Sequence, residues 1–72
     1  MEMTQQFVDA LRKQYEADIA SARATALVYL QKPVAIGEHP QFLEELDKLI
    51  TDISNAEENL KTLTKHFDDV PF

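Results

Sequence analysis

Residues 40–67 read PQFLEELDKLITDISNAEENLKTLTKHF, and this stretch decides the fold. Apolar residues recur in it at alternating steps of four and three, without a miss. They are Phe42, Leu46, Leu49, Ile53, Ala56, Leu60, Leu63 and Phe67. Such heptad spacing places them along one side of an α-helix, as in a coiled coil. The stretch therefore predicts a long helix whose apolar stripe, the seam, packs against another helix.

Residues at the two ends of this helix favour helix termini. Pro40 suits the first helical position, and Glu44 lies near the positive end of the helix dipole. Lys65 and His66 lie near the negative end. We therefore expect the helix to cover about residues 40–67.

A second helix is predicted upstream, over about residues 4–31. Thr4 can cap its start, and Pro33 disfavours helical geometry at Lys32. Its apolar residues recur at steps of three, four and four, which is an eleven-residue repeat. They are Val8, Leu11, Tyr15, Ile19, Ala22, Ala26 and Leu30.

The two predicted helices are similar in length, and the short connection between them favours an antiparallel arrangement. We therefore expect an all-α, antiparallel two-helix hairpin that forms a single domain over residues 1–72, with a short extended tail at 68–72. In the register that sets large side chains against small ones, Tyr15 meets Ala56 and Ala22 meets Leu49.

Chain length and composition point to association with another chain. A chain of 72 residues buries only a small fraction of its surface, so its core alone supplies little stability. The chain has no cysteine, which excludes disulfides and thiolate metal sites. A homo-oligomer, most simply a dimer, is therefore expected.

Charge and hydropathy exclude two classes of partner. The net charge of −6 argues against nucleic acid, because proteins that bind it use clustered Lys and Arg. No stretch reaches the roughly 20 apolar residues of a membrane span, and the N-terminal residues do not form a targeting segment. We expect a soluble, intracellular protein.

The sequence predicts no catalytic, metal-binding or cofactor-binding residues. The neighbouring acids Glu44 and Glu45 diverge on a helix, as do Glu57 and Glu58. The two histidines, His39 and His66, fall at opposite ends of the hairpin. With one glycine, the chain cannot form a phosphate-binding loop, and it has no serine elbow. We expect a protein that is not an enzyme.

Apolar residues beside the seam crowd the half of the hairpin near the connection. They form the predicted self-association or partner-binding surface, whose members are Leu27, Val28, Tyr29, Val34, Ile36, Leu43 and Ile50. A second hairpin that covers them would form a four-helix bundle with two-fold symmetry. The alternative is that Val34 and Ile36 fold back and cover the surface within one chain.

The segment PVAIGEHP at residues 33–40, with QFLEELDKLI at 41–50, resembles small two-helix proteins of unknown function encoded by tailed bacteriophages. This resemblance implies a viral accessory or virion role in the host cytoplasm or the virion, with a host or viral protein as a possible partner. A second reading starts from the nine acids and three lysines of residues 33–72. It makes the protein an acidic inhibitor that occupies a basic, nucleic-acid-binding site on a host protein.

Overall fold

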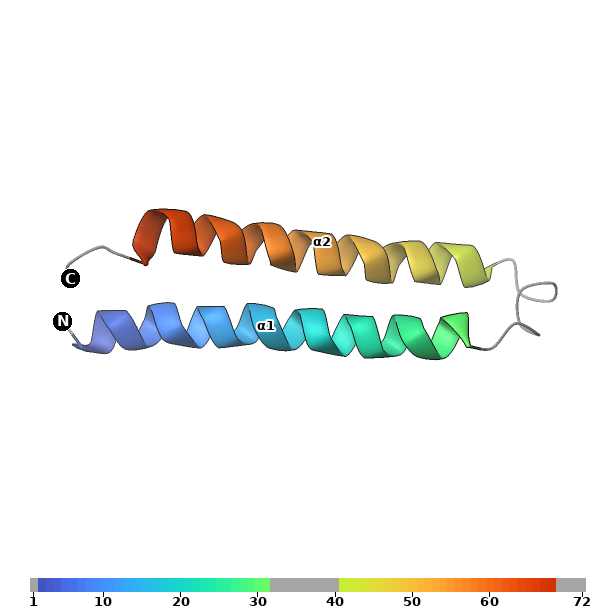
Figure 1. Cartoon of the computed structure of the whole chain (residues 1–72), viewed down its shortest axis with the longest axis horizontal. Helices are drawn as coiled ribbons and strands as arrows, with labels where there is room; N and C mark the ends of the chain where they lie inside the picture. The colour runs from blue at the N-terminus through green and yellow to red at the C-terminus, as the bar shows by residue number, and fades with distance from the viewer. Residues whose placement is uncertain (1, 32–40, 69–72) are drawn as a thin grey trace.

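The protein is a pair of α-helices that lie side by side and run in opposite directions (Figure 1). The computed structural model describes residues 2–31 and 41–68. Helix α1 covers Glu2–Leu30, and helix α2 covers Gln41–Phe67. The start of α1 and the end of α2 lie at the same end of the molecule. The predicted helical hairpin is confirmed, whereas the connection at 32–40 and the tail at 69–72 lie outside the described residues.

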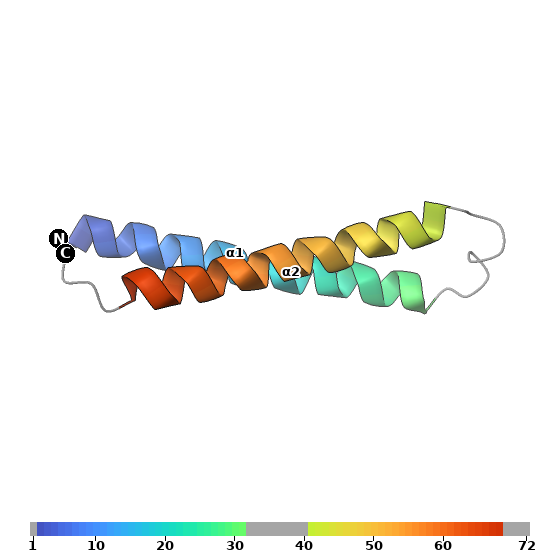
Figure 2. The ribbon, with the colours of Figure 1, turned by 90° about the horizontal axis from the view of Figure 1, so that it is seen from above.

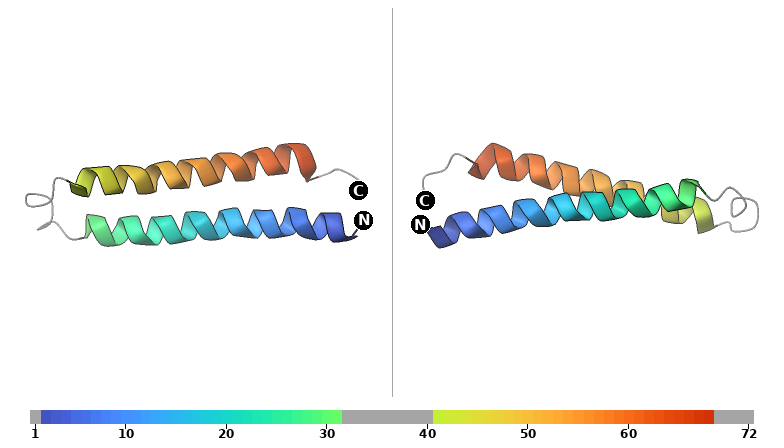
Figure 3. Two further views of the ribbon diagram at one scale, coloured as in Figure 1. Left: turned by 180° about the vertical axis from the view of Figure 1, so that it is seen from behind. Right: turned by 60° about the horizontal axis from the view of Figure 1, so that its bottom comes forward.

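The molecule is a thin rod. Its extents are 54 × 15 × 13 Å. Its radius of gyration is 16.4 Å, compared with about 11 Å for a compact domain of this length. The helices stay together along their whole length in two further views (Figure 3) and cross at a shallow angle when seen from above (Figure 2). Within residues 2–31 and 41–68, each helix therefore has only the other helix as a neighbour, and most of its residues are exposed.

The helix boundaries differ from the predicted ones at the start of α1. The helix begins at Glu2, so Thr4 lies inside the first turn and is not the cap that we expected. At the other end, the Gln31 N–H donates hydrogen bonds to the carbonyls of Leu27 and Val28, which closes the last turn.

The predicted seam of α2 faces α1. Phe42, Ala56 and Leu63 are buried, and the four seam residues between them are half-buried. Phe67 is the exception, because it lies in the last turn of α2 and remains 46% exposed. The core is thus a single row of side chains from each helix.

The seam of α1 differs from the predicted one. The residues that α1 turns toward α2 are Val8, Arg12, Tyr15, Ile19, Ala22, Ala26 and Tyr29. Their steps are four and three in strict alternation, so α1 has the same heptad period as α2. The predicted eleven-residue repeat was wrong, and Leu11 and Leu30, which it assigned to the seam, are exposed.

Arg12 shows how a charged residue occupies a seam position. Its guanidinium donates a hydrogen bond to the Thr64 hydroxyl at 3.0 Å and pairs with the Asp68 carboxylate at 2.5 Å. The aliphatic stem of an arginine can cover apolar surface while its charged end reaches polar groups. Arg12 therefore ties the start of α1 to the end of α2, where Phe67 contributes little to the core.

Candidate functional site

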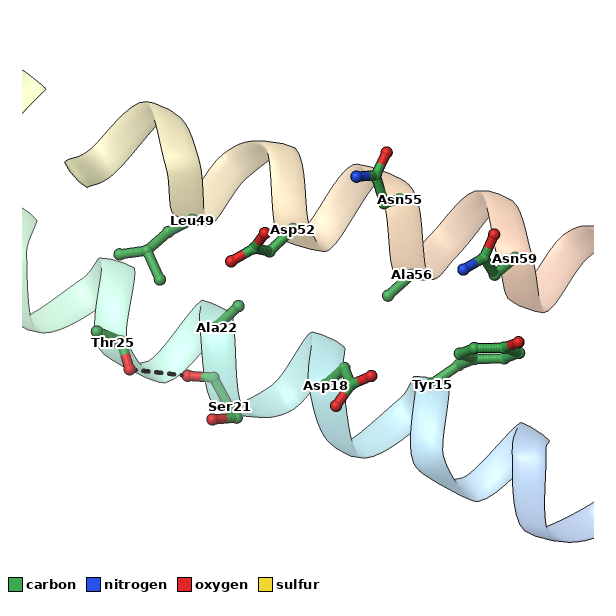
Figure 4. A pocket seen from close by; sticks show the side chains of 10 residues that line it. All are labelled: Tyr15, Asp18, Ser21, Ala22, Thr25, Leu49, Asp52, Asn55, Ala56 and Asn59. Carbon is green, nitrogen blue, oxygen red and sulfur yellow. Dashed lines mark hydrogen bonds between the residues drawn. The ribbon is translucent and has the colours of Figure 1, made fainter. Parts of the chain in front are cut away.

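One long side of the hairpin carries an open polar groove between the two helices (Figure 4). Its volume is about 370 Å³. Five residues from each helix line it: Tyr15, Asp18, Ser21, Ala22, Thr25, Leu49, Asp52, Asn55, Ala56 and Asn59.

The groove combines negative charge with uncharged polar groups. Asp18 of α1 and Asp52 of α2 contribute two carboxylates, and no lining residue is basic. The Thr25 hydroxyl donates a hydrogen bond to the Ser21 carbonyl of the same helix, so the Thr25 proton already has an acceptor. Asp18 and Asp52 are the lining side chains that could act as general bases, and among the described residues no hydrogen bond joins either of them to the hydroxyl of Ser21 or Thr25.

The residues that line the groove also show which positions of the two helices lie opposite each other. Tyr15 and Ala56 line it together, as do Ala22 and Leu49, and Figure 4 shows these side chains between the ribbons. Tyr29 and Phe42, each one residue from the end of its helix, have ring centroids 5.8 Å apart. The first two pairs agree with the predicted register, whereas Phe42 meets Tyr29 and not Leu30, which that register set against it.

The opposite long side of the hairpin has a shallow hollow beside the second half of α2. Its lining residues are Ile19, Glu57, Leu60, Lys61, Thr64 and Lys65. In α2, Glu57 and Thr64 belong to a column with seven-residue spacing that continues upstream to Ile50 and Leu43. This column therefore runs along the side of the seam that faces away from the polar groove.

Four large apolar side chains gather on that side, at the end of the rod near residues 31 and 41. They form the loop-side patch, whose members are Leu27, Leu30, Leu43 and Ile50, and all four are exposed. Each comes directly after a seam residue, which places all of them on the same side of their helices. Leu43 is 70% exposed and Ile50 is 53% exposed. Leu30 belongs to this patch because Tyr29, and not Leu30, occupies the last seam position of α1.

The other predicted surface residues lie elsewhere. Val28 is exposed, but it follows Leu27 by about 100° around α1 and points away from the patch. Tyr29 is half-buried in the seam, where its ring packs against Phe42. Val34 and Ile36 lie outside the described residues, so their predicted positions are not tested.

The Tyr29 hydroxyl donates a hydrogen bond to the Glu45 carboxylate across the two helices. This hydrogen bond, together with partial desolvation and the negative charge of Glu45, raises the pKa of Tyr29 above its ordinary value of 10.0. The hydrogen bond accounts for the presence of a tyrosine at a seam position, because the ring packs inside while its polar end has a partner.

Removing the Glu45 carboxylate should lower the pKa of Tyr29 toward 10.0. The chain has two tyrosines, so the titration is measured by tyrosinate absorbance in a Tyr15→Phe background, where Tyr29 alone reports. Glu45→Ala is compared with Glu44→Ala, which removes the neighbouring acid. Equal midpoints for these two variants would contradict the assignment.

The same shift gives a pH dependence of stability. Because the folded-state pKa of Tyr29 is raised, its contribution is fully present below pH 10.0, the unfolded value, and is lost as the pH rises through the folded value. Glu45→Ala should flatten this alkaline part of the stability profile.

The remaining polar groups do not form a metal-binding cluster within the part of the chain that the structure describes. His66 lies in the last turn of α2, with its ring 6.3 Å from that of Phe67. Neither of the two described helices is long and apolar enough to cross a membrane.

Comparison of the chain with protein families, with curated proteins and with solved structures finds no match.

Proposed function

We propose that this protein is a non-enzymatic helical interaction module, and that it works by pairing with a second copy of itself through the loop-side patch. The observation that carries this proposal is the exposure of Leu27, Leu30, Leu43 and Ile50 on one side of a hairpin with a thin core. Contiguous apolar patches of this kind mark association surfaces in soluble proteins.

The area of the molecule supports the same proposal. The accessible surface is 5721 Å², about 1,200 Å² more than the roughly 4,500 Å² expected of a compact monomer of 8.2 kDa. A standard protein interface covers about 800 Å² on each partner. One contact with a second hairpin would therefore remove most of the excess, and the product would be a four-helix bundle.

The distribution of acids favours this proposal over the acidic inhibitor. On α2, Glu45 and Asp52 lie on the side of the polar groove, whereas Glu57 borders the hollow on the opposite side. Glu44 and Glu58 lie on the outer side of the helix. A mimic of nucleic acid would need its acids on one continuous face, and α2 disperses them.

The test is a charge insertion at the centre of the patch. The Leu43→Glu, Ile50→Glu double variant should weaken self-association at least about a hundred-fold, because each apolar side chain contributes roughly 1.5–3 kcal/mol when a partner covers it. Sedimentation velocity at tens of micromolar gives the mass, and circular dichroism checks that the helices persist.

Thr51→Glu with Thr62→Glu provides the matched control, since it adds the same charge to exposed positions of α2 outside the patch. This control should associate like the parent. A monomeric parent protein, or a double variant that associates as tightly as the parent, would overturn the proposed use of the loop-side patch.

A further inference from the structure

The last seam position of α1 can be filled by either of two neighbouring residues. Ala26 is buried, and the next seam residue can follow it by three positions, at Tyr29, or by four, at Leu30. Both steps keep a side chain on roughly the same side of an α-helix. The end of α1 near residue 31 therefore has two possible packings, and the structure contains the one with Tyr29 inside.

Apolar character alone would favour the other packing. Leucine is fully buried in proteins more often than tyrosine, yet Leu30 is 57% exposed and Tyr29 is half-buried. Two contacts with α2 favour Tyr29. Its ring centroid lies 5.8 Å from that of Phe42 in a tilted arrangement, which is favourable for aromatic pairs, and its hydroxyl donates a hydrogen bond to Glu45. Leu30 could make neither contact in its place.

The hydrogen bond also determines the side on which Leu30 lies. Glu45 directly precedes a seam residue of α2, as do Asp52 and Asn59, which line the polar groove. The Tyr29 hydroxyl therefore leaves the seam on the side of the groove. Leu30 follows Tyr29 by about 100° around α1, so it lies on the opposite side, in the loop-side patch.

We propose that Tyr29 is a positioning residue for the loop-side patch. By filling the last seam position, it keeps Leu30 on the surface, where a second copy can cover it. Without the ring of Tyr29, the end of α1 rotates, Leu30 packs in the seam beside Phe42, and the patch loses one of its four members. The part of this inference that concerns association rests on the proposed function, whereas the position of Leu30 does not.

Tyr29→Ala should bring Leu30 into the seam. The measurement is the relaxation enhancement that a soluble paramagnetic agent gives the Leu30 methyl signals in NMR, because it increases with exposure to solvent. It is made in the Leu43→Glu, Ile50→Glu background, so that no second copy covers Leu30. The enhancement should fall from that of an exposed residue to that of a half-buried seam residue such as Ile19.

Two further substitutions at position 29 make this test specific. Tyr29→Phe keeps the ring, so Leu30 should remain as exposed as in the parent. Tyr29→Leu fills the position with an apolar side chain that lacks both contacts of the tyrosine, so residues 29 and 30 compete for the seam and the enhancement should be intermediate. This variant decides the question if alanine unfolds the hairpin, which circular dichroism detects.

Val28→Ala is the matched control, since it shortens an exposed side chain in the same turn that points away from the patch. It should leave the enhancement of Leu30 unchanged. A Leu30 that stays fully exposed in every folded Tyr29 variant would overturn the inference.

A double-mutant cycle tests the effect on association, with dissociation constants from sedimentation equilibrium. Leu30→Ala should weaken self-association about ten-fold, because a second copy no longer covers the leucine. Tyr29→Leu should weaken association several-fold in the parent, but it should have no effect in the Leu30→Ala background, because Tyr29 acts through Leu30. An equal loss in both backgrounds would mean that Tyr29 affects association by another route, and would contradict the inference.

The outcomes separate this inference from the proposed function. If Leu30 stays exposed in the Tyr29 variants, the inference is wrong, and the loop-side patch can still be the association surface. If Leu30 moves inward but Leu30→Ala associates like the parent, Tyr29 does not act on association and that part is wrong. If the Leu43→Glu, Ile50→Glu variant associates like the parent, the proposed function fails, and the NMR measurement still decides the position of Leu30.

Discussion

Replacing Phe42 with alanine should remove a large part of the stability of the hairpin, about 3–5 kcal/mol. Phe42 is 7% exposed, and its ring lies 5.8 Å from that of Tyr29, at the end of α2 where the chain enters the helix. Loss of a buried phenylalanine costs about 3–5 kcal/mol. A domain of this length has roughly 4–11 kcal/mol of stability in total. The substitution therefore removes much of the stability of a core that consists of one row of side chains from each helix.

The measurement is the helical circular dichroism signal during urea unfolding, at one fixed protein concentration because association adds to stability. Phe67→Ala is the matched control, since Phe67 occupies the same kind of seam position at the other end of α2 but is 46% exposed. It should cost less than half as much. Equal losses at the two positions would show that the burial of Phe42 does not stabilise the hairpin.

Ala26→Asp should destabilise the hairpin by about 3–5 kcal/mol at neutral pH, the cost of a buried charge without a partner. Ala26 is the most buried residue among those described, at 5% exposure, and it faces the seam of α2. The short stem of aspartate cannot carry its carboxylate out to water, unlike the long stem of Arg12. Ala20→Asp is the control, because Ala20 is exposed on the same helix.

The free energy of unfolding that the Ala26→Asp variant loses should increase as the pH rises. Burial raises the pKa of the introduced carboxyl above its unfolded value of about 3.9. The variant therefore approaches the parent at pH 3, where the carboxyl is neutral in both states, and loses stability as the pH rises. Urea midpoints of variant and parent at pH 3 and pH 7 measure this. A difference between variant and parent that does not change with pH would mean that the site is hydrated.

The sequence predicted only some of the residues of the loop-side patch. Leu27, Leu43 and Ile50 are exposed at positions directly after seam residues, and this could be read from the spacing of α2 and from Ala26. Leu30 was assigned to the seam, and Tyr29 to the surface, although their positions in the structure are the reverse. An apolarity scale favours leucine over tyrosine for a core. The ring of Tyr29 nevertheless packs inside because Glu45 of the other helix accepts its hydrogen bond.

By itself, the sequence determined that the protein is a hairpin of two long helices and that α2 packs through one heptad seam. Only one side of α2 is continuously apolar, so its apolar residues fit a single helical spacing. The side of α1 that faces α2 was decided by tertiary structure, because α1 has apolar residues on several sides and two spacings fit them. A straight row of contacts with a heptad partner requires the same period in both helices, and this requirement selects Arg12 and Tyr29 over Leu11 and Leu30.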